Sequence, residues 1–113
     1  MALTRDFKET IQRRVRRDPA FRRALLREAA ESMLSGDTGT GKAVLRDYIN
    51  STMGFPELAE ATHIPPKSLM RMLGPNGNPR ADNIFDIMAF VQQHEGVRFQ
   101  VKTAAERQKR RAS

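Results

Sequence analysis

Short amphipathic segments separated by turn residues run along most of this chain. In the first segment, Leu3, Phe7, Ile11 and Val15 recur every fourth residue, a spacing that places them on one face of a helix. The same periodicity returns further along, and most segments end at Gly or Pro, residues that interrupt regular structure. The pattern predicts an all-α fold built from short helices.

The turn residues set the expected helix boundaries. Asp18 is placed to cap a second helix, with Pro19 at its first position. That helix is expected to end near Ser35-Gly36, where glycine suits a C-cap. The remaining helices are expected at 44–53, 56–62, 66–73 and 83–94, with Asp82 capping the last of them.

Two stretches depart from the helical pattern. Residues 74–81, GPNGNPRA, are dense in turn residues and are expected to form a loop. Residues 97–102, VRFQVK, alternate apolar and polar side chains, as a short strand does. The fold is therefore expected to contain one short C-terminal strand beside its helices.

The composition restricts the function classes. The chain has no cysteine, so disulfides, thiolate catalysis and Cys-based zinc sites are excluded. Its N-terminus lacks the apolar run of a signal peptide, and no stretch approaches the roughly 20 apolar residues of a membrane helix, so a cytoplasmic location is expected. The net charge of +7 favours a polyanionic partner such as nucleic acid; a solvated basic surface is the alternative.

The stretch SGDTGTGKAV, residues 35–44, comes close to a nucleotide-binding loop. Gly36, Gly41 and Lys42 have the Walker A spacing, but Ala43 stands where Ser or Thr would bind Mg²⁺. A helical pattern precedes the stretch, whereas a phosphate loop follows a strand. We therefore interpret residues 36–43 as a glycine-rich joint, with Asp37 or Thr40 capping the next helix and Lys42 in solvent.

Residues 54–88 carry a pattern with a known mechanism. Two short helices flank a tight turn at His63-Ile64-Pro65, and the small Ala59 allows them to cross closely. This spacing indicates a helix–turn–helix, whose second helix enters the DNA major groove. The apolar residues expected to form the shared core of this unit are Leu58, Ile64, Leu69 and Met72.

A family resemblance covers residues 55–101. The segments that carry it are ELAEAT, KSLMRML, GNP and the helix 83–94 followed by GVRFQV, with DPAFRRALLREAAESMLSGD upstream. These residues resemble Xre/Cro-type helix–turn–helix proteins, and within them the HigA-like addiction-module antidotes. The resemblance implies a lambda-repressor-like fold, a bacterial antitoxin-like autorepressor of a toxin–antitoxin module, and a RelE/HigB-like toxin as a partner.

Two positions depart from that family. His63 stands where the family usually has Gly, at a turn position that often needs a positive φ. A non-glycine residue there costs roughly 1 kcal/mol, although His tolerates the conformation better than most. Pro65 stands where the family caps the second helix with Ser or Thr, while Pro66 suits a first helical turn.

The expected organisation follows from these patterns. N-terminal helices occupy 1–35, the joint 36–43, the DNA-binding helix–turn–helix domain 44–102, and a basic, frayed tail 103–113. The expected DNA-binding residues of the second helix are Pro66, Lys67, Ser68, Met70 and Arg71. Those of the following loop, expected to hold phosphates, are Asn76, Asn78 and Arg80.

Interpretations without DNA contact remain open for several of these residues. Lys67 and Arg71 are alternatively charges facing solvent, Met70 a partial core residue, and the asparagines ordinary turn residues. His63 and His94 lack an acidic cluster, so neither a metal site nor a catalytic base is expected, and no cofactor or enzymatic activity is predicted.

The predicted partner is an operator in double-stranded DNA, bound by a homodimer. Either residues 97–102 or the N-terminal helices are candidates for the dimer contact. The alternative function is a helical protein-interaction adaptor, whose Arg-rich helices bind an acidic protein without sequence-specific DNA binding.

Overall fold

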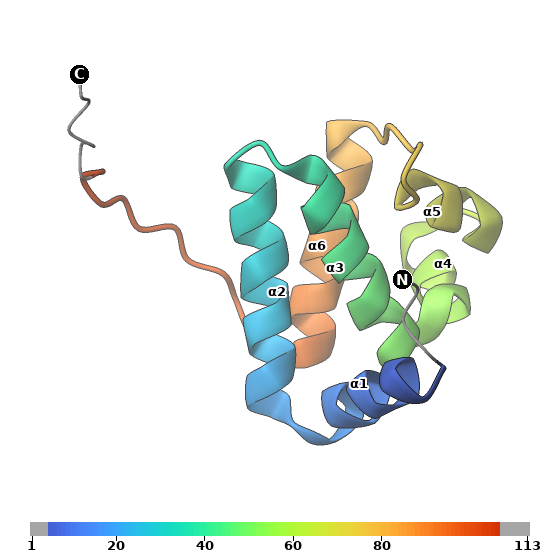
Figure 1. Cartoon of the computed structure of the whole chain (residues 1–113). Helices are drawn as coiled ribbons and strands as arrows, with labels where there is room; N and C mark the ends of the chain where they lie inside the picture. The colour runs from blue at the N-terminus through green and yellow to red at the C-terminus, as the bar shows by residue number, and fades with distance from the viewer. Residues whose placement is uncertain (1–4, 107–113) are drawn as a thin grey trace.

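A computed structural model describes residues 5–106, and every regular element within them is an α-helix (Figure 1). This confirms the predicted all-α class. In chain order the helices are α1 (Arg5–Arg17), α2 (Pro19–Leu34), α3 (Thr38–Ser51), α4 (Gly54–Thr62), α5 (Pro66–Met72) and α6 (Ala81–Glu95). Leu3, assigned to the first helix from its spacing, and residues 107–113 of the tail lie outside the described residues.

The ends of α2 follow the predicted turn chemistry. The Asp18 carboxylate accepts a hydrogen bond from the backbone N–H of Phe21 at 3.2 Å, and Pro19 occupies the first helical turn. At the other end, Gly36 has a φ of +96°, a conformation that glycine adopts without a Cβ clash. Local sequence therefore specified both boundaries of this helix.

The glycine-rich stretch is mostly helical, which corrects the joint expected over 36–43. Asp37 caps α3 by accepting a hydrogen bond from Thr40 N–H at 3.2 Å, so the helix begins at Thr38. A Cβ on Gly41 would collide with the Met33 side chain of α2. The glycine thus allows close packing of α2 against α3, which outweighs its low helix propensity. A helix, not a strand, precedes the stretch.

One hydrophobic core joins α2 to α6. Its central side chains, Leu45, Tyr48, Leu58, Leu69 and Ile87, are fully buried. Leu26 and Ala29 of α2 belong to the same cluster, so the core runs across the boundary expected at residue 35. Each helix within residues 5–106 is too short or too polar to traverse a lipid bilayer.

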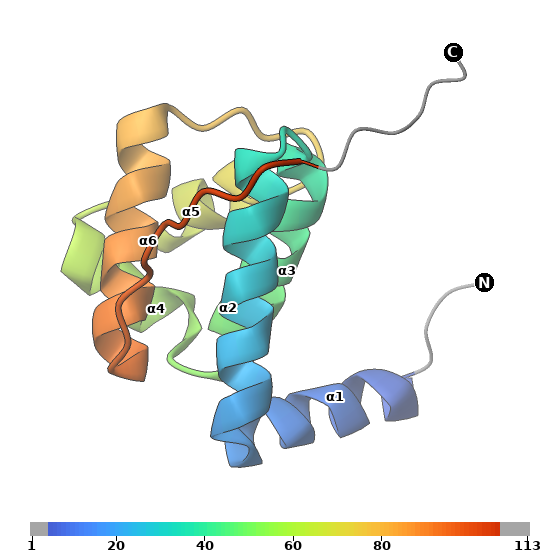
Figure 2. The same ribbon diagram turned by 90° about the vertical axis from the view of Figure 1, so that its left-hand side faces the viewer.

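Helix α1 is the least embedded element. It extends away from the lower end of α2 (Figure 2), and Val15 is its buried residue. Phe7, on the same face, is half exposed. The predicted apolar face therefore contacts the rest of the described protein mainly through its C-terminal turn.

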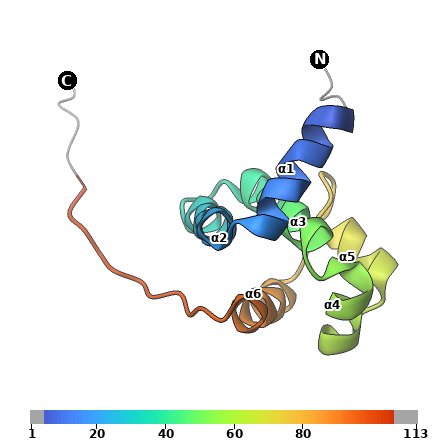
Figure 3. The ribbon, with the colours of Figure 1, turned by 90° about the horizontal axis from the view of Figure 1, so that it is seen from below.

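The strand expected over 97–102 is absent, because no second strand lies among the described residues to pair with it. The segment is instead an extended chain beside α6 and α2 (Figures 2 and 3). The N–H of Val97 donates to the Gln92 carbonyl at 3.0 Å, and that of Phe99 to Gln92 Oε1 at 2.7 Å. Phe99 packs against the core.

The expected cap of α6 is also corrected. The helix begins at Ala81 with Arg80 in the N-cap position, and no side chain caps it there. Asp82 lies within the first turn and accepts a hydrogen bond from the neighbouring Asn83 N–H. Its carboxylate still lies near the positive end of the helix dipole. Gly96 ends the helix with a φ of +73°.

Candidate functional site

The unit that places the predicted DNA-binding residues is the pair α4 and α5. Phe55 and Leu58 of α4 are buried in the shared core. The Thr62 hydroxyl donates to the Leu58 carbonyl at 2.9 Å in the last turn of the helix. Helix α4 thus presents a fixed end from which the chain turns into α5.

The turn between the two helices has a left-handed residue at position 63, where His stands in place of Gly. His63 has a φ of 60° and a ψ of 31°, in the left-handed region, and its N–H donates to the Ala59 carbonyl at 2.8 Å. Pro65 makes no side-chain cap, but its carbonyl accepts the Leu69 N–H at 3.0 Å. The turn therefore forms with His at 63 and Pro at 65, and Ile64 packs against the core.

Helix α5 has one anchored face and one open face. Leu69 is fully buried, as is Leu73 directly after the helix, and Met72 packs against the core. Lys67, Met70 and Arg71 are exposed; Met70 keeps 47% of its surface accessible, so it is not a core residue. Since residues three and four apart share a helix face, these three side chains form one patch.

Two basic side chains of α3 hold the loop that follows α5. Lys42 Nζ donates to the Gly77 carbonyl at 2.7 Å, and an Arg46 guanidinium nitrogen donates to the Leu73 carbonyl at 2.8 Å. A Cβ on Gly77 would collide with the carbonyls of Arg71 and Met72. The loop therefore folds back tightly onto the end of α5.

These contacts were not predicted from the sequence. Lys42 is 8% exposed, which corrects its expected position in solvent. One signal was present: Lys42 and Arg46 lie four residues apart on the helix face that also carries Leu45 and Ile49. The sequence could not show which carbonyls, some 30 residues away, would accept from them.

The predicted site residues fall into one continuous region formed by α5 and its loop. Pro66 and Ser68 are partly buried, and their side chains are the least available. Arg80 is 81% exposed in its side chain and lies 3.4 Å from the Asp82 carboxylate. The exposed members of the region are Lys67, Met70, Arg71, Asn76, Asn78 and Arg80.

The positive charge of the chain lies mostly outside this region. Residues 36–96 contain five Lys or Arg against seven Asp or Glu. Residues 5–17 contain six Lys or Arg against two acidic residues. The basic balance that favours a polyanionic partner therefore belongs to α1 and to residues 97–113.

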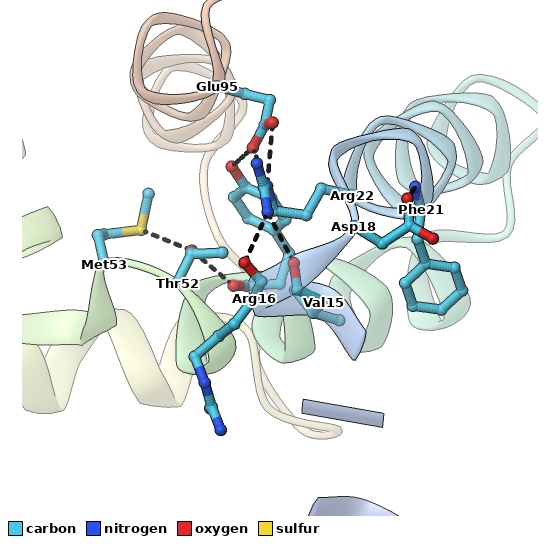
Figure 4. A network of polar contacts seen from close by, with 9 residues as sticks. Val15, Arg16, Asp18, Phe21, Arg22, Thr52, Met53 and Glu95 are labelled. Atoms are coloured by element: carbon cyan, nitrogen blue, oxygen red, sulfur yellow. Dashed lines mark hydrogen bonds and ion pairs between the residues drawn. The ribbon is translucent and has the colours of Figure 1, made fainter. Parts of the chain in front are cut away.

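A buried polar network attaches α1 to the core (Figure 4). The Arg22 guanidinium donates to both Glu95 carboxylate oxygens at 2.9 and 3.0 Å. It also donates to the carbonyls of Val15 and Arg16 at the end of α1. The Tyr48 hydroxyl donates to Glu95 Oε1 at 2.6 Å. One arginine thus joins α1, α2 and α6.

The surroundings of Glu95 favour its charged form. Burial alone would raise the pKa of Glu95, but hydrogen bonds from Tyr48 and Arg22 outweigh it, so the pKa is lowered. Burial and the Glu95 carboxylate together raise the pKa of the Tyr48 hydroxyl, which stays protonated as the donor. The network is a structural connection, because its groups already satisfy one another.

Within residues 5–106 no three His, Cys, Asp or Glu side chains cluster as metal ligands do. No protein-family model, curated protein or solved structure matched the chain when each was compared with it. Any functional assignment therefore depends on the geometry of α4, α5 and the loop.

Proposed function

We propose that the protein is a sequence-specific DNA-binding regulator, in which α4 and α5 form a helix–turn–helix. The observation that carries the proposal is the division of α5 into two faces. Leu69 and Leu73 fix the helix in the core, while Lys67, Met70 and Arg71 are exposed. A recognition helix needs this combination of a rigid mount and free side chains.

The exposed side chains suit the edges of base pairs. Arg71 and Lys67 are the residue types that donate to the guanine O6 and N7 acceptors in the major groove. Met70 is apolar and suits contact with a thymine methyl group. Asn76, Asn78 and Arg80 are suited to bind phosphates, which fixes the register without reading the sequence.

Such a regulator acts by occupying its site on the DNA. A homodimer would place two copies of α5 in successive major grooves, roughly 34 Å apart, on an inverted repeat. An operator in the protein's own promoter would make it an autorepressor. A role as an antitoxin, with a RelE/HigB-like toxin bound elsewhere, rests on the family resemblance alone.

The charge distribution suggests that α1 and α5 contribute to DNA binding in different ways. The six basic residues of α1 would supply sequence-independent attraction to phosphates, which depends steeply on salt. The two basic residues of α5 would supply the discrimination, with each good base contact worth roughly 1–3 kcal/mol. Affinity and specificity would then depend on different helices.

The same charge distribution favours the second candidate, a protein-interaction adaptor. Acidic residues outnumber basic ones over 36–96, and α4 itself carries Glu57 and Glu60. On this alternative the α4–α5 pair only completes the core, and α1 binds an acidic protein. The two candidates differ in whether any duplex sequence is preferred.

The test is binding of the full chain to the duplex upstream of its own gene, followed by fluorescence anisotropy, with a scrambled duplex as competitor. At about 150 mM salt, the regulator is expected to prefer its operator by about a hundredfold or more. A selection from randomised duplexes extends the test to operators located elsewhere.

Arg71→Ala and Arg13→Ala form the matched pair of variants, since both remove one exposed arginine. Arg71→Ala is expected to abolish the preference, while Arg13→Ala weakens binding to both duplexes alike. Equal, salt-sensitive binding to every duplex, together with no enriched sequence from the randomised pool, would contradict the proposal and favour the adaptor.

A further inference from the structure

Side chains of α2 and of the extended segment 97–102 line a groove. Both of these elements lie on the side of the molecule away from α5 (Figures 1 and 3). The volume of the groove is about 410 Å³. The sequence pattern predicted a strand at this segment and made it a candidate for a dimer contact. In the structure, α2 forms the opposite wall of the groove. Nothing in the function proposed for α5 uses this surface.

One edge of the extended segment is already occupied. The N–H groups of Val97 and Phe99 donate to Gln92 of α6. In an extended chain alternate residues direct their backbone groups to opposite edges, so Arg98, Gln100 and Lys102 face the other way. Within residues 5–106 the N–H groups of these three residues make no hydrogen bond. The segment therefore offers an unpaired strand edge.

The groove combines apolar and basic side chains. Leu34 of α2 and Val101 of the segment are 74% and 82% exposed, so both aliphatic side chains are accessible to a partner. Four basic residues line the same groove against the single acidic residue Glu31: Arg23, Arg27, Arg98 and Lys102. None of these four forms an ion pair with a described residue.

These features select among possible occupants. A second copy paired antiparallel about Gln100 would set Arg98 opposite Lys102, and like charges directly opposite destabilise a strand pair. A DNA backbone would satisfy the cations but leave Leu34 and Val101 without apolar contacts. An extended peptide with alternating acidic and apolar side chains satisfies the cations, the apolar side chains and the strand edge together.

We propose that α2 and residues 97–102 form a docking groove for an acidic, extended segment of a partner protein, which adds as a strand to the open edge of 98–102. The main-chain hydrogen bonds supply affinity, and the basic and aliphatic side chains supply specificity. The groove acts independently of what α5 contacts.

The test uses a fluorescein-labelled peptide of about eight residues, the length of an ordinary strand, in which Glu alternates with Val. Binding to the full chain is measured by anisotropy, and the location by amide resonances of the isotope-labelled protein. The expected result is a Kd of about 10–100 µM, with shifted resonances in α2 and 97–102. A peptide with Lys in place of Glu should bind at least about tenfold more weakly.

Gln100→Pro tests strand addition, because proline removes the open N–H without changing the charge. Gln100→Pro should weaken binding of the Glu–Val peptide by about tenfold. Gln100→Ala, which keeps the N–H, should have little effect on that binding. Arg27→Glu should weaken binding more than Arg13→Glu, which makes the same charge change on α1. All three substituted residues are exposed, so the four variants are expected to fold.

Three results would contradict the proposed docking groove. They are no binding of the Glu–Val peptide at about 1 mM, equal effects of Arg27→Glu and Arg13→Glu on its binding, or unchanged binding in Gln100→Pro. Displacement of the peptide by duplex DNA, with duplex-induced shifts in 97–102, would assign the groove to phosphates and also overturn it. Duplex-induced shifts confined to 66–80 would support the function proposed for α5 and leave the groove as a separate site. The two proposals can therefore fail separately.

Discussion

Helices α5 and α1 both present basic side chains to solvent, but they are held in opposite ways. Helix α5 is anchored by Leu69 and the adjoining Leu73, and Lys42 and Arg46 bind the carbonyls that follow it. Helix α1 has Val15 as its buried residue, and Arg22 binds the carbonyls of its last turn. The anchored helix has two cations, and the projecting helix has six.

The difference shows how packing and charge are distributed in a small protein. A side chain can read a surface accurately only if its helix is fixed, which requires buried apolar contacts. Charges that attract a partner over a distance need no such fixation. Substitutions in and around the two helices test whether they are as unequal as their contacts indicate.

The largest expected effect is the loss of an anchor beneath α5. Leu69→Ala should reduce the free energy of unfolding by about 3–4 kcal/mol, because it leaves a cavity in the shared core. Val15→Ala removes fewer methyl groups, from outside the central cluster, and should cost about 2 kcal/mol or less. Urea denaturation followed by circular dichroism measures both. Equal losses would show that α1 is as firmly embedded as α5.

The connection of α1 to the core should be the next most sensitive. Glu95→Gln replaces the buried partner of Arg22 and should cost about 2 kcal/mol. Because the folded pKa of Glu95 lies below its ordinary 4.5, its contribution is fully present above that pH. It is lost as the pH falls through the folded pKa.

The wild type should therefore lose stability on acidification more steeply than the Glu95→Gln variant. Glu60→Gln, an exposed carboxylate on α4, is the control and should leave the pH profile unchanged. Parallel profiles for wild type and Glu95→Gln between pH 7 and pH 3 would contradict the assigned role of the network.

A smaller effect is expected at the loop that carries Asn76 and Asn78. Lys42→Met keeps the aliphatic stem but leaves the Gly77 carbonyl without its donor, at a cost of about 1 kcal/mol. Amide hydrogen exchange in 74–80 should become faster, while exchange in α2 is unchanged. Lys8→Met, at an exposed position on α1, should alter neither. Unchanged exchange in the loop would show that its own turns are sufficient to hold it.

The smallest effect has the opposite sign. His63→Gly relieves the left-handed conformation and should change the stability by at most about 1 kcal/mol, in the stabilising direction. Ala61→Gly, at an exposed position within α4, should destabilise by about 1 kcal/mol. Thermal unfolding measures both. A loss of stability in His63→Gly would mean that the imidazole makes a contribution of its own.

Much of the fold could be read from short-range patterns. The caps at Asp18 and Asp37, the left-handed glycines 36 and 96, and the prolines around 65 each act within a few residues, so their effect on the backbone is visible in the sequence. The apolar periodicity likewise identified the six helices and most of the buried face of α5. The exposure of Lys67 and Arg71 agreed with expectation, although exposure alone does not show what they bind.

Contacts between distant segments decided the rest. Lys42 is buried because Gly77 approaches it across 35 residues, and residues 97–102 are no strand because residues 5–106 contain no other strand to pair with them. The glycine-rich stretch is helical because α2 packs closely on it at Gly41. Local dihedral preferences amount to about 1 kcal/mol or less per residue, so the packed chain overrides them wherever burial and long-range hydrogen bonds favour another conformation.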